Sequence, residues 1–259
     1  MSLSESDLMR HARQIVLPEI GGTGQERLLA ASVLVIGAGG LGSPLLLYLA
    51  AAGVGRIGVV DFDVVDLSNL QRQVVFSTAD CGTKKVEAVR ARLKELNPHV
   101  QLVPHDLRLD AGNAAGLVAG YDVIADGCDD LGTRLVVHDA AMAAGKPLVS
   151  GAVQGMDGQL TTYKAYLGAP HPCMRCLMRE EPGGDTLPTC AQGGILGAAA
   201  GVVGSLQAVE VIKEILGHES LSGRMMHYDA MACDLTPMRL PRRDACRQTC
   251  VEFSPSRAR

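Results

Sequence analysis

The sequence VLVIGAGGLG at residues 33–42 joins four apolar residues to a turn that has glycine at positions 37, 39, 40 and 42. An apolar run without polar side chains predicts a strand that is buried on both faces, as in a parallel sheet. The first two glycines let the backbone turn tightly and approach a ligand, and the last lets the following helix, expected at residues 43–52, pack close to the strand. The N-terminal N–H groups of that helix point at whatever the turn holds, and a phosphate is the natural ligand.

The rest of the chain alternates strand and helix patterns around this stretch. Further strands are predicted at residues 56–61, 100–105, 121–126 and 147–153, and helices at 4–17, 24–30, 84–96 and 134–144. Later segments predict short antiparallel strands at 158–166, 224–229 and 235–240, and a long, apolar, buried helix at about 194–216. We therefore expect an α/β fold: a Rossmann-like, doubly wound, mostly parallel sheet that is extended by antiparallel strands in the C-terminal half.

Composition limits the class of protein. The chain has 259 residues, of which 47% are hydrophobic, which is enough to bury a large core and fits one large α/β domain or two small ones. We expect a single domain over residues 1–259. A net charge of -4 leaves no basic excess for a nucleic-acid backbone, so we expect no nucleic-acid partner. The N-terminus lacks a signal-peptide pattern and the longest apolar stretches, 41–55 and 195–209, are too short to cross a bilayer, so we expect a cytoplasmic protein without a membrane partner. Eight cysteines in such a chain indicate metal or thiol chemistry rather than disulfides.

Polar residues after the second predicted strand indicate a nucleotide site. Asp61 lies 19 residues after the last glycine of the turn, where a ribose-binding carboxylate is expected. The segment DFDVVDLSNLQRQ occupies residues 61–73, and Lys85 and the acid pair Asp129 and Asp130 follow. Cations together with a carboxylate that can hold Mg²⁺ suit a triphosphate, whose charge must be neutralised while one bond breaks. A nicotinamide-dependent oxidoreductase is the alternative at this point, although it leaves the basic residues unexplained.

Seven motifs spread along the chain point to one family. They are GAGGLGSP at 37–44, DFDVVDLSNLQRQ at 61–73, GTKKVEA at 82–88, LNPH at 96–99, VSGA at 149–152, CMRC at 173–176 and GSLQAVEVIK at 204–213. Together they resemble the MoeB/ThiF/HesA family, the bacterial relatives of ubiquitin-activating enzymes. The resemblance covers about residues 5–250, and the 61–73 segment is far more specific than the glycine turn.

The resemblance implies an adenylylation reaction. The C-terminal glycine carboxylate of a small ubiquitin-like sulfur-carrier protein of the MoaD/ThiS type attacks the α-phosphate of ATP, giving an acyl-adenylate and pyrophosphate. That carboxylate is already ionised at neutral pH, so no general base is needed and catalysis rests on alignment and charge neutralisation. The implied nucleotide-binding residues are Gly37, Gly39, Gly40, Gly42, Asp61, Asp63, Ser68, Asn69, Leu70, Gln71, Arg72, Lys85, Asp129 and Asp130, with Asp61 on the ribose.

The same resemblance assigns catalytic roles. Arg72 and Lys85 are placed on phosphates and Asp129 on Mg²⁺. Arg13 matches a family arginine that reaches into the partner subunit's site, so the working unit is expected to be a homodimer. Cys190 matches a family cysteine that engages the carrier's sulfur, with an inert small residue as the alternative reading. The implied catalytic set is Arg13, Arg72, Lys85, Asp129 and Cys190.

Two cysteine pairs predict a second chemical site. Cys173-x-x-Cys176 has zinc-knuckle spacing and Cys246-x3-Cys250 supplies another pair, so four thiolates can close a tetrahedral structural Zn²⁺ site. Family members pair two C-x-x-C motifs, so the longer second spacing is a departure, and loss of the metal or use of His171 as a substitute ligand stays open. The remaining cysteines without a partner at ligand spacing, Cys81, Cys128 and Cys233, are expected to be packing residues.

Two further positions depart from the family pattern. Cys128-Asp129-Asp130 stands where the family usually writes TDN, and an asparagine that the family places near His138 is missing. Extra negative charge at Asp130 either strengthens metal binding or weakens ATP binding. A catalytically impaired, zinc-braced binding protein is therefore a further alternative.

The resemblance also predicts how the domain is divided and what it binds. Residues 1–153 form the nucleotide-binding half, and residues 154–259 form the carrier-binding and zinc-binding half. The expected partners are a sulfur carrier with C-terminal Gly-Gly, a second copy of the chain, and a separate sulfur donor of the cysteine desulfurase or rhodanese type, because the chain ends at Arg259 without the length of a rhodanese domain. The product would serve molybdopterin, thiamine or related sulfur transfer.

Overall fold

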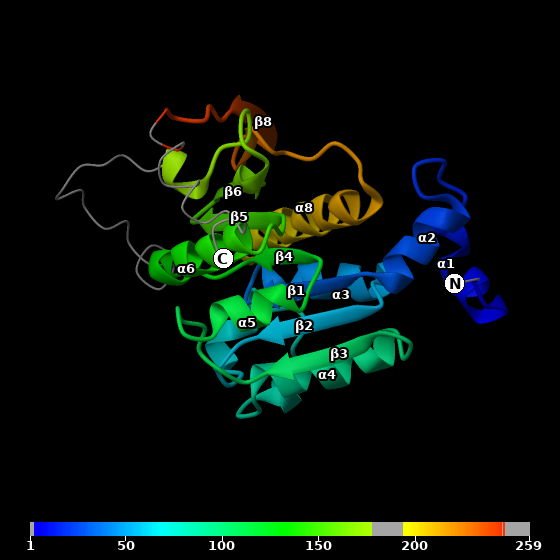
Figure 1. The fold of residues 1–259 in the computed structure, drawn as a ribbon. Coiled ribbons are helices and arrows are strands. Elements are labelled where there is room, and N and C mark those ends of the chain that lie inside the picture. Colours follow the sequence, from blue (N-terminus) through cyan, green and yellow to red (C-terminus); the bar gives the residue numbers. More distant parts are fainter. Residues whose placement is uncertain (1–2, 178–193, 245, 247–259) are drawn as a thin grey trace.

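The computed structural model describes residues 3–177, 194–244 and 246. Within these residues, helices lie on both faces of one eight-stranded sheet (Figure 1). The strands are β1 Ser32–Ile36, β2 Arg56–Val60, β3 Gln101–His105, β4 Val123–Asp126, β5 Leu148–Gln154, β6 Asp157–Tyr163, β7 Arg224–Asp229 and β8 Asp234–Arg239. The helices are α1 Glu5–Ile15, α2 Gly21–Ala30, α3 Gly42–Ala52, α4 Lys85–Leu96, α5 Ala114–Ala119, α6 Leu131–Ala143 and α8 Gly197–Leu216, besides short 3-10 segments.

The strand order is β3-β2-β1-β4-β5-β6-β7-β8. The strands from β3 to β5 in this order run parallel, and β6, β7 and β8 are added antiparallel. The predicted fold class is therefore confirmed. After β1 the chain builds the sheet outward to β3 and then returns to place β4 on the other side of β1. In open α/β sheets, ligands bind at the carboxyl ends of the strands where the order reverses, which here is between β1 and β4.

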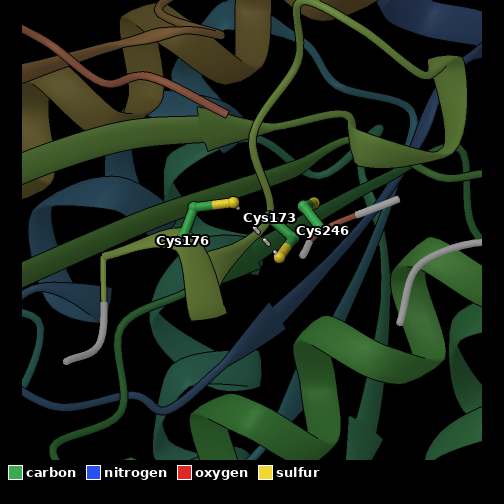
Figure 2. A group of neighbouring side chains, drawn as sticks. All are labelled: Cys173, Cys176 and Cys246. Carbon is green, nitrogen blue, oxygen red and sulfur yellow. Dashed lines mark hydrogen bonds between the residues drawn. The ribbon is translucent and has the colours of Figure 1, made fainter. Parts of the chain in front are cut away.

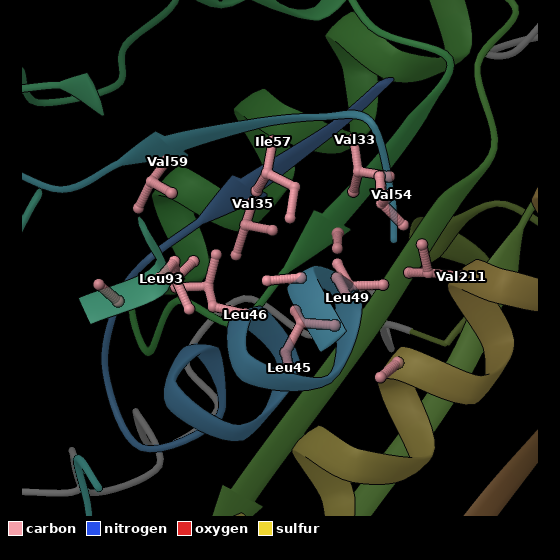
Figure 3. Close-up of a cluster of buried hydrophobic side chains, with 14 of the residues drawn as sticks. Val33, Val35, Leu45, Leu46, Leu49, Val54, Ile57, Val59, Leu93 and Val211 are labelled. Atoms are coloured by element: carbon pink, nitrogen blue, oxygen red, sulfur yellow. The ribbon is translucent and has the colours of Figure 1, made fainter. Parts of the chain in front are cut away.

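The apolar run at the start of the glycine turn forms the centre of the core. Side chains of β1 and β2 pack onto Leu45, Leu46 and Leu49 of α3 (Figure 3). Helices α4 and α8 complete this face, whereas α5 and α6 cover the opposite face. Because strands in the middle of the sheet are covered on both sides, they need apolar side chains at every position, as the sequence pattern predicted.

Three details differ from the sequence-based expectation. Helix α5 was not predicted, because six residues rich in alanine and glycine give no amphipathic period. The long helix α8 begins at Gly197 rather than near residue 194, since Ile195 instead forms a bridge with Gly155. The expectation that α8 is buried all round is wrong, because it packs on the sheet and α3 with one side and leaves the Val209 side chain 52% exposed.

Among the described residues, none of the helices combines the length and the apolarity that crossing a membrane requires.

Candidate active site and thiol cluster

The glycine loop, residues 37–42, joins the end of β1 to the start of α3. Gly37 has a φ of +89°, a conformation that side chains disfavour, and its N–H donates to the Val60 carbonyl at 2.8 Å. A Cβ on Gly42 would lie 2.0 Å from the Gly37 carbonyl oxygen, so only glycine lets α3 begin this close to the strand. The loop thus brings backbone and a helix N-terminus to the carboxyl end of β1, the arrangement that binds phosphates.

Asp61, at the end of β2, holds the glycine loop by hydrogen bonds. Its carboxylate is 8% exposed and accepts the Ala38 N–H at 2.8 Å and the Asp63 N–H at 2.9 Å. Each carboxylate oxygen keeps further lone pairs for a ligand hydroxyl. The residue that the sequence assigned to a ribose therefore also fixes the loop, a contact that no sequence spacing reveals.

Two cations are connected to this loop, Arg72 by direct packing and Lys85 through Asp63. The Lys85 ammonium is nearly buried, at 5% exposure, and pairs with the Asp63 carboxylate at 2.9 Å. The Arg72 side chain runs along Gly40, since a Cβ on that glycine would lie 3.5 Å from the Arg72 Cγ, and its guanidinium donates to the Ser68 carbonyl at 3.1 Å. Arg72 therefore lies at the glycine loop itself, whereas Lys85 is linked to the loop through Asp63, whose N–H donates to Asp61.

The other predicted residues of the 67–73 segment have structural partners. The Asn69 carbonyl accepts the N–H groups of Arg72 and Gln73, which shapes the turn that carries the arginine. The Ser68 hydroxyl donates to Asp66 at 2.6 Å, Leu70 packs against the core, and Gln71 is exposed. Direct contact of these residues with a nucleotide stays a prediction.

Gln73 is a candidate ligand-binding residue that the sequence pattern did not predict. Its side chain is 4% exposed, and its Oε1 atom has no hydrogen-bond donor among the described residues. The Nε2 atom lies 3.9 Å from the position that a Cβ on Gly39 would take. A buried amide with a vacant acceptor beside the loop is suited to a ligand, but only its burial distinguishes it from the neighbouring Gln71.

The acidic segment after β4 separates into different roles. Asp129 is exposed, and the backbone before it packs on the glycine loop, since a Cβ on Gly37 would lie 3.4 Å from the Gly127 carbonyl oxygen. Asp130 is the N-cap of α6, where its carboxylate accepts the Thr133 N–H and hydroxyl at 2.7 Å, and these hydrogen bonds lower the pKa of Asp130. The charge that departs from the family pattern is therefore engaged in capping, which leaves Asp129 as the carboxylate open to a cation.

Arg13 does not lie near the glycine loop of its own chain. It is exposed on α1, and the neighbouring Gln14 amide donates to the Ala52 carbonyl at the last turn of α3. The glycine loop is at the first turn of α3, and the 11 residues of that helix span about 16 Å. Figure 1 shows α1 at the edge of the molecule opposite the carboxyl ends of the parallel strands.

The thiols of Cys173, Cys176 and Cys246 form what we call the thiol cluster (Figure 2). All three are buried, and their sulfur atoms lie within 4.8 Å of one another. The Cys173 and Cys176 sulfurs are 3.7 Å apart, which matches the ~3.8 Å between two sulfurs that bind one tetrahedral Zn²⁺ at ~2.3 Å. His171 is not in this group of described donors, and its Nδ1 atom instead bonds to the Ser222 hydroxyl at 2.8 Å.

The remaining cysteines correct one expectation. Cys190 and Cys250 lie outside the described residues. Cys81 and Cys233 are exposed, so the expectation that they are packing residues is wrong. Cys128 is half-buried and its thiol donates to the Asp126 carboxylate at 2.8 Å; burial, reinforced by that carboxylate, raises the pKa of the thiol.

Helix α6 is tied to the turn that carries the first two cysteines. The Met174 N–H donates to His138 Nε2 at 3.1 Å, and Arg175 forms an ion pair with two hydrogen bonds to Asp139. Burial alone would raise the pKa of Asp139, but hydrogen bonds from His138 and Arg175 lower it to about 2. His138, near which the family pattern has an asparagine, therefore helps to hold the cysteine turn against α6.

Comparison with known proteins identifies a matching family and related chains. The family model described as the ThiF family matches residues 11–248. The chain is 44% identical over 252 residues to the sulfur carrier protein adenylyltransferase of Thermus thermophilus, covering 95% of this chain and 93% of that relative. It is also 49% identical over 243 residues to the adenylyltransferase and sulfurtransferase MOCS3 of Bos taurus, covering 93% of this chain. That alignment covers 53% of the MOCS3 protein, so the chain spans about half the length of the MOCS3 relatives that it matches.

Solved structures share the fold. The crystal structure of Escherichia coli MccB with MccA-N7isoASN matches with a TM-score of 0.79 over 92% of this chain and 74% of that chain. The sequence identity is 21%, so this likeness concerns the fold alone.

Proposed function

The chain belongs to the ThiF family, and from that premise we propose that it is an ATP-dependent adenylyltransferase for the C-terminal glycine carboxylate of a ubiquitin-like sulfur-carrier protein. The observation that carries this proposal is the position of Arg72 along Gly40, with Lys85 held nearby by Asp63. Two cations at a glycine loop suit a triphosphate. They would be unexplained in a nicotinamide site, whose ligand carries a pyrophosphate bound mainly by backbone N–H groups.

The reaction asks for alignment rather than for acid–base chemistry. A C-terminal carboxylate has a pKa near ~3.5 and is already a nucleophile at neutral pH. The backbone of the glycine loop and the start of α3 would hold the phosphates, and Arg72 and Lys85 would neutralise the charge that moves onto the pyrophosphate leaving group. Asp61, by its place at the end of β2, would hold the ribose.

The exposed Asp129 carboxylate fits a Mg²⁺ ion that accompanies ATP. It faces solvent next to the glycine loop, and its neighbour Asp130 is occupied as a helix cap. Mg²⁺ prefers one or two carboxylates together with phosphate oxygens and water, which is what this edge offers. When bound, the ion supplies charge neutralisation between phosphates.

The thiol cluster fits a structural Zn²⁺ ion. Three buried cysteines supply soft ligands with sulfur spacing suited to a tetrahedral site. We propose that Cys250 is the fourth ligand. Since Cys246 follows the last strand, this metal would fasten the C-terminal segment to the turn at Cys173.

We also propose that two chains form the working unit. Arg13 lies about one helix length from its own glycine loop, so it can serve a phosphate site only in a neighbouring chain. A groove of about 300 Å³ runs between α1, α3 and α8, with Tyr48 57% exposed and Val209 52% exposed. Such an apolar face beside Arg13 suits an isologous interface with a second copy.

Subunit mixing tests that arrangement. Arg13→Ala and Lys85→Ala proteins should each be inactive, but a mixture should recover activity because each heterodimer has one site with both residues intact. The recovery should approach about half of the wild-type activity per heterodimer. Absence of recovery after subunit exchange has been verified by mass spectrometry would contradict action across an interface.

The antiparallel extension is the proposed carrier-binding face. Strands β7 and β8 form one end of the sheet, and β8 is exposed along its whole length. Sulfur from a separate donor of the cysteine desulfurase or rhodanese type would then attack the acyl-adenylate carbonyl, which forms a carbon–sulfur bond, breaks the bond to phosphate and releases AMP.

Pyrophosphate exchange tests the proposed function. Labelled pyrophosphate should enter ATP only when a carrier protein with C-terminal Gly-Gly is present, and a carrier that lacks the last glycine is the matched control. Carrier-dependent exchange supports the proposal. A binding protein without catalysis would bind ATP or the carrier but give no exchange. An oxidoreductase would show neither this binding nor exchange.

A further inference from the structure

Asp126, the last residue of β4, is a buried carboxylate with several donors. It is 0% exposed, and its Oδ1 atom accepts the Cys128 N–H at 3.1 Å and the Cys128 thiol at 2.8 Å. Its Oδ2 atom accepts the Ser150 hydroxyl at 3.0 Å. Arg134 Nε lies 3.1 Å from the same oxygen, with an angle that makes the contact an ion pair rather than a hydrogen bond.

Arg134 connects this carboxylate to α6 and β5. Its guanidinium donates to the Gly151 carbonyl and lies 3.5 Å from the Ser150 hydroxyl, so three elements meet at one side chain. Burial alone would lower the pKa of the guanidinium, but the Asp126 carboxylate raises it, so the guanidinium keeps its charge. Forming such a pair costs solvation, and removing one partner leaves an uncompensated charge in the core.

In the sequence, Asp126 precedes the exposed Asp129 and Arg134 follows it. Ahead of it, Asp126 fixes the Cys128 N–H and Gly127 packs on the glycine loop. Behind it, Asp130 caps α6, the helix that carries Arg134 one turn later. The backbone on both sides of Asp129 is therefore fixed, and the ion pair joins the two sides.

We propose that Asp126 and Arg134 are positioning residues, and that their buried ion pair holds the loop at residues 127–129 so that Asp129 faces a Mg²⁺–ATP complex at the glycine loop. This inference rests on the proposed function. Groups that hold a metal ligand in place typically contribute 10–100-fold to metal affinity. Ser150 assists by holding the carboxylate oxygen that faces Arg134.

A competing role for Arg134 is direct contact with the carrier. The guanidinium lines a cavity of about 120 Å³ together with Leu131, Tyr163 and Met174, and a peptide tail entering this space would meet it. The fully buried Asp126 carboxylate, 3.1 Å from Arg134, weakens the attraction of this guanidinium for a second carboxylate. The two roles differ in which substrate loses affinity when Arg134 is changed.

The experiment measures Mg²⁺–ATP binding by calorimetry over a series of Mg²⁺ concentrations, together with the KM for the carrier and the melting temperature. Arg134→Met should weaken Mg²⁺–ATP binding about tenfold or more and raise the Mg²⁺ concentration at half-saturation, while the carrier KM stays within about twofold. Ser150→Ala should give a smaller change in the same direction. Arg92→Met, which removes an exposed arginine of α4, is the matched control and should change neither quantity.

A double variant separates positioning from folding. Asp126→Leu with Arg134→Met removes both charges, so it should melt closer to wild type than Arg134→Met does, yet it should still bind Mg²⁺–ATP about tenfold more weakly. Wild-type affinity in the double variant would overturn the inference, as would a rise in the carrier KM with Mg²⁺–ATP binding unchanged. A wild-type protein that binds Mg²⁺–ATP but shows no carrier-dependent exchange would contradict the proposed function alone, because binding would still report on the positioning.

Discussion

The glycine loop and the thiol cluster both depend on close approach, but of different parts of the chain. In the glycine loop, backbone meets backbone, and Gly42 leaves no space for a side chain against the Gly37 carbonyl. In the thiol cluster, three side chains from two distant segments meet within 4.8 Å. The glycine loop depends on the absence of a side chain at Gly42, and the thiol cluster depends on the sulfur atoms of its three cysteines.

This difference predicts opposite sensitivities. Adding one carbon at Gly42 disturbs the strand–helix junction at the centre of the core, so the glycine loop is sensitive to added side-chain atoms. Removing a sulfur from the thiol cluster removes a ligand and should cost stability. Removing the Lys85 or Arg72 side chain should instead cost catalysis and leave the fold in place. The predictions below change the glycine-loop site, the thiol cluster or the contact that docks the cysteine turn on α6.

Gly42→Ala should have the largest effect on stability. The new Cβ would lie 2.0 Å from a backbone oxygen, which cannot rotate away, so β1 and α3 must separate. We expect a loss of about 3 kcal/mol or more in the free energy of unfolding, measured by urea denaturation. Gly201→Ala in α8 is the control, since nothing lies within 4 Å of its Cβ position, and it should be neutral or slightly stabilising. Equal stability of the two variants would contradict the close approach.

Lys85→Ala tests the chemistry of the same site without altering its backbone. Removing a buried cation from the loop should lower pyrophosphate exchange about a hundredfold, which corresponds to ~3 kcal/mol of transition-state stabilisation. Arg72→Ala should behave similarly. Lys84→Ala is the matched control, because Lys84 is the neighbouring residue but pairs with Asp106 at the surface. Activity within twofold of wild type in both Lys85→Ala and Arg72→Ala would remove these residues from the site.

Cys173→Ala should break the thiol cluster by removing one ligand. Because metal binding free energy contributes to folding, the variant should lose bound zinc and its melting temperature should fall by about 5 °C or more. Cys233→Ala removes an exposed thiol and should change neither zinc content nor melting temperature. Cys190→Ala should likewise keep its zinc and its pyrophosphate exchange, since an ionised carboxylate and ATP need no thiol. Stoichiometric zinc in Cys173→Ala would contradict the assignment of the ligand.

Some features of these two sites could be predicted from the sequence, and others could not. Strand β1, the glycine loop and α3 were predictable because burial on both faces and the need for glycine are written in adjacent residues. The Cys173 and Cys176 pair was predictable because its ligand spacing is local. The roles of Asp126 and Arg134 were not, since they depend on a contact between a strand end and a helix whose residues carry no motif. The same holds for Asp130, where a capping carboxylate and a metal-binding carboxylate look alike in sequence.

Asp139→Asn should have the smallest effect and should change with pH, while leaving every thiol in place. The pKa of Asp139 is lowered from 3.8 to about 2 in the folded chain, so its ionised form stabilises the fold at any pH above about 4. At pH 7 the free energy of unfolding of the variant should therefore be lower by about 1–2 kcal/mol, a figure that allows for solvent screening of a partly exposed pair. The reason is that the introduced amide would keep one hydrogen bond to the cysteine turn but would form no ion pair with Arg175. As the pH falls from about 4 toward 2, the wild-type carboxylate becomes protonated in the unfolded chain first, so the difference between the two proteins should shrink and reach about half its size near pH 3. Urea denaturation at pH 7, 5, 4 and 3 measures this, with Asp157→Asn at an exposed position as the control that should stay within about 0.5 kcal/mol of wild type at pH 7. A difference that stays constant down to pH 3 would mean that packing of the turn, and not the charge of Asp139, docks the cysteines on α6.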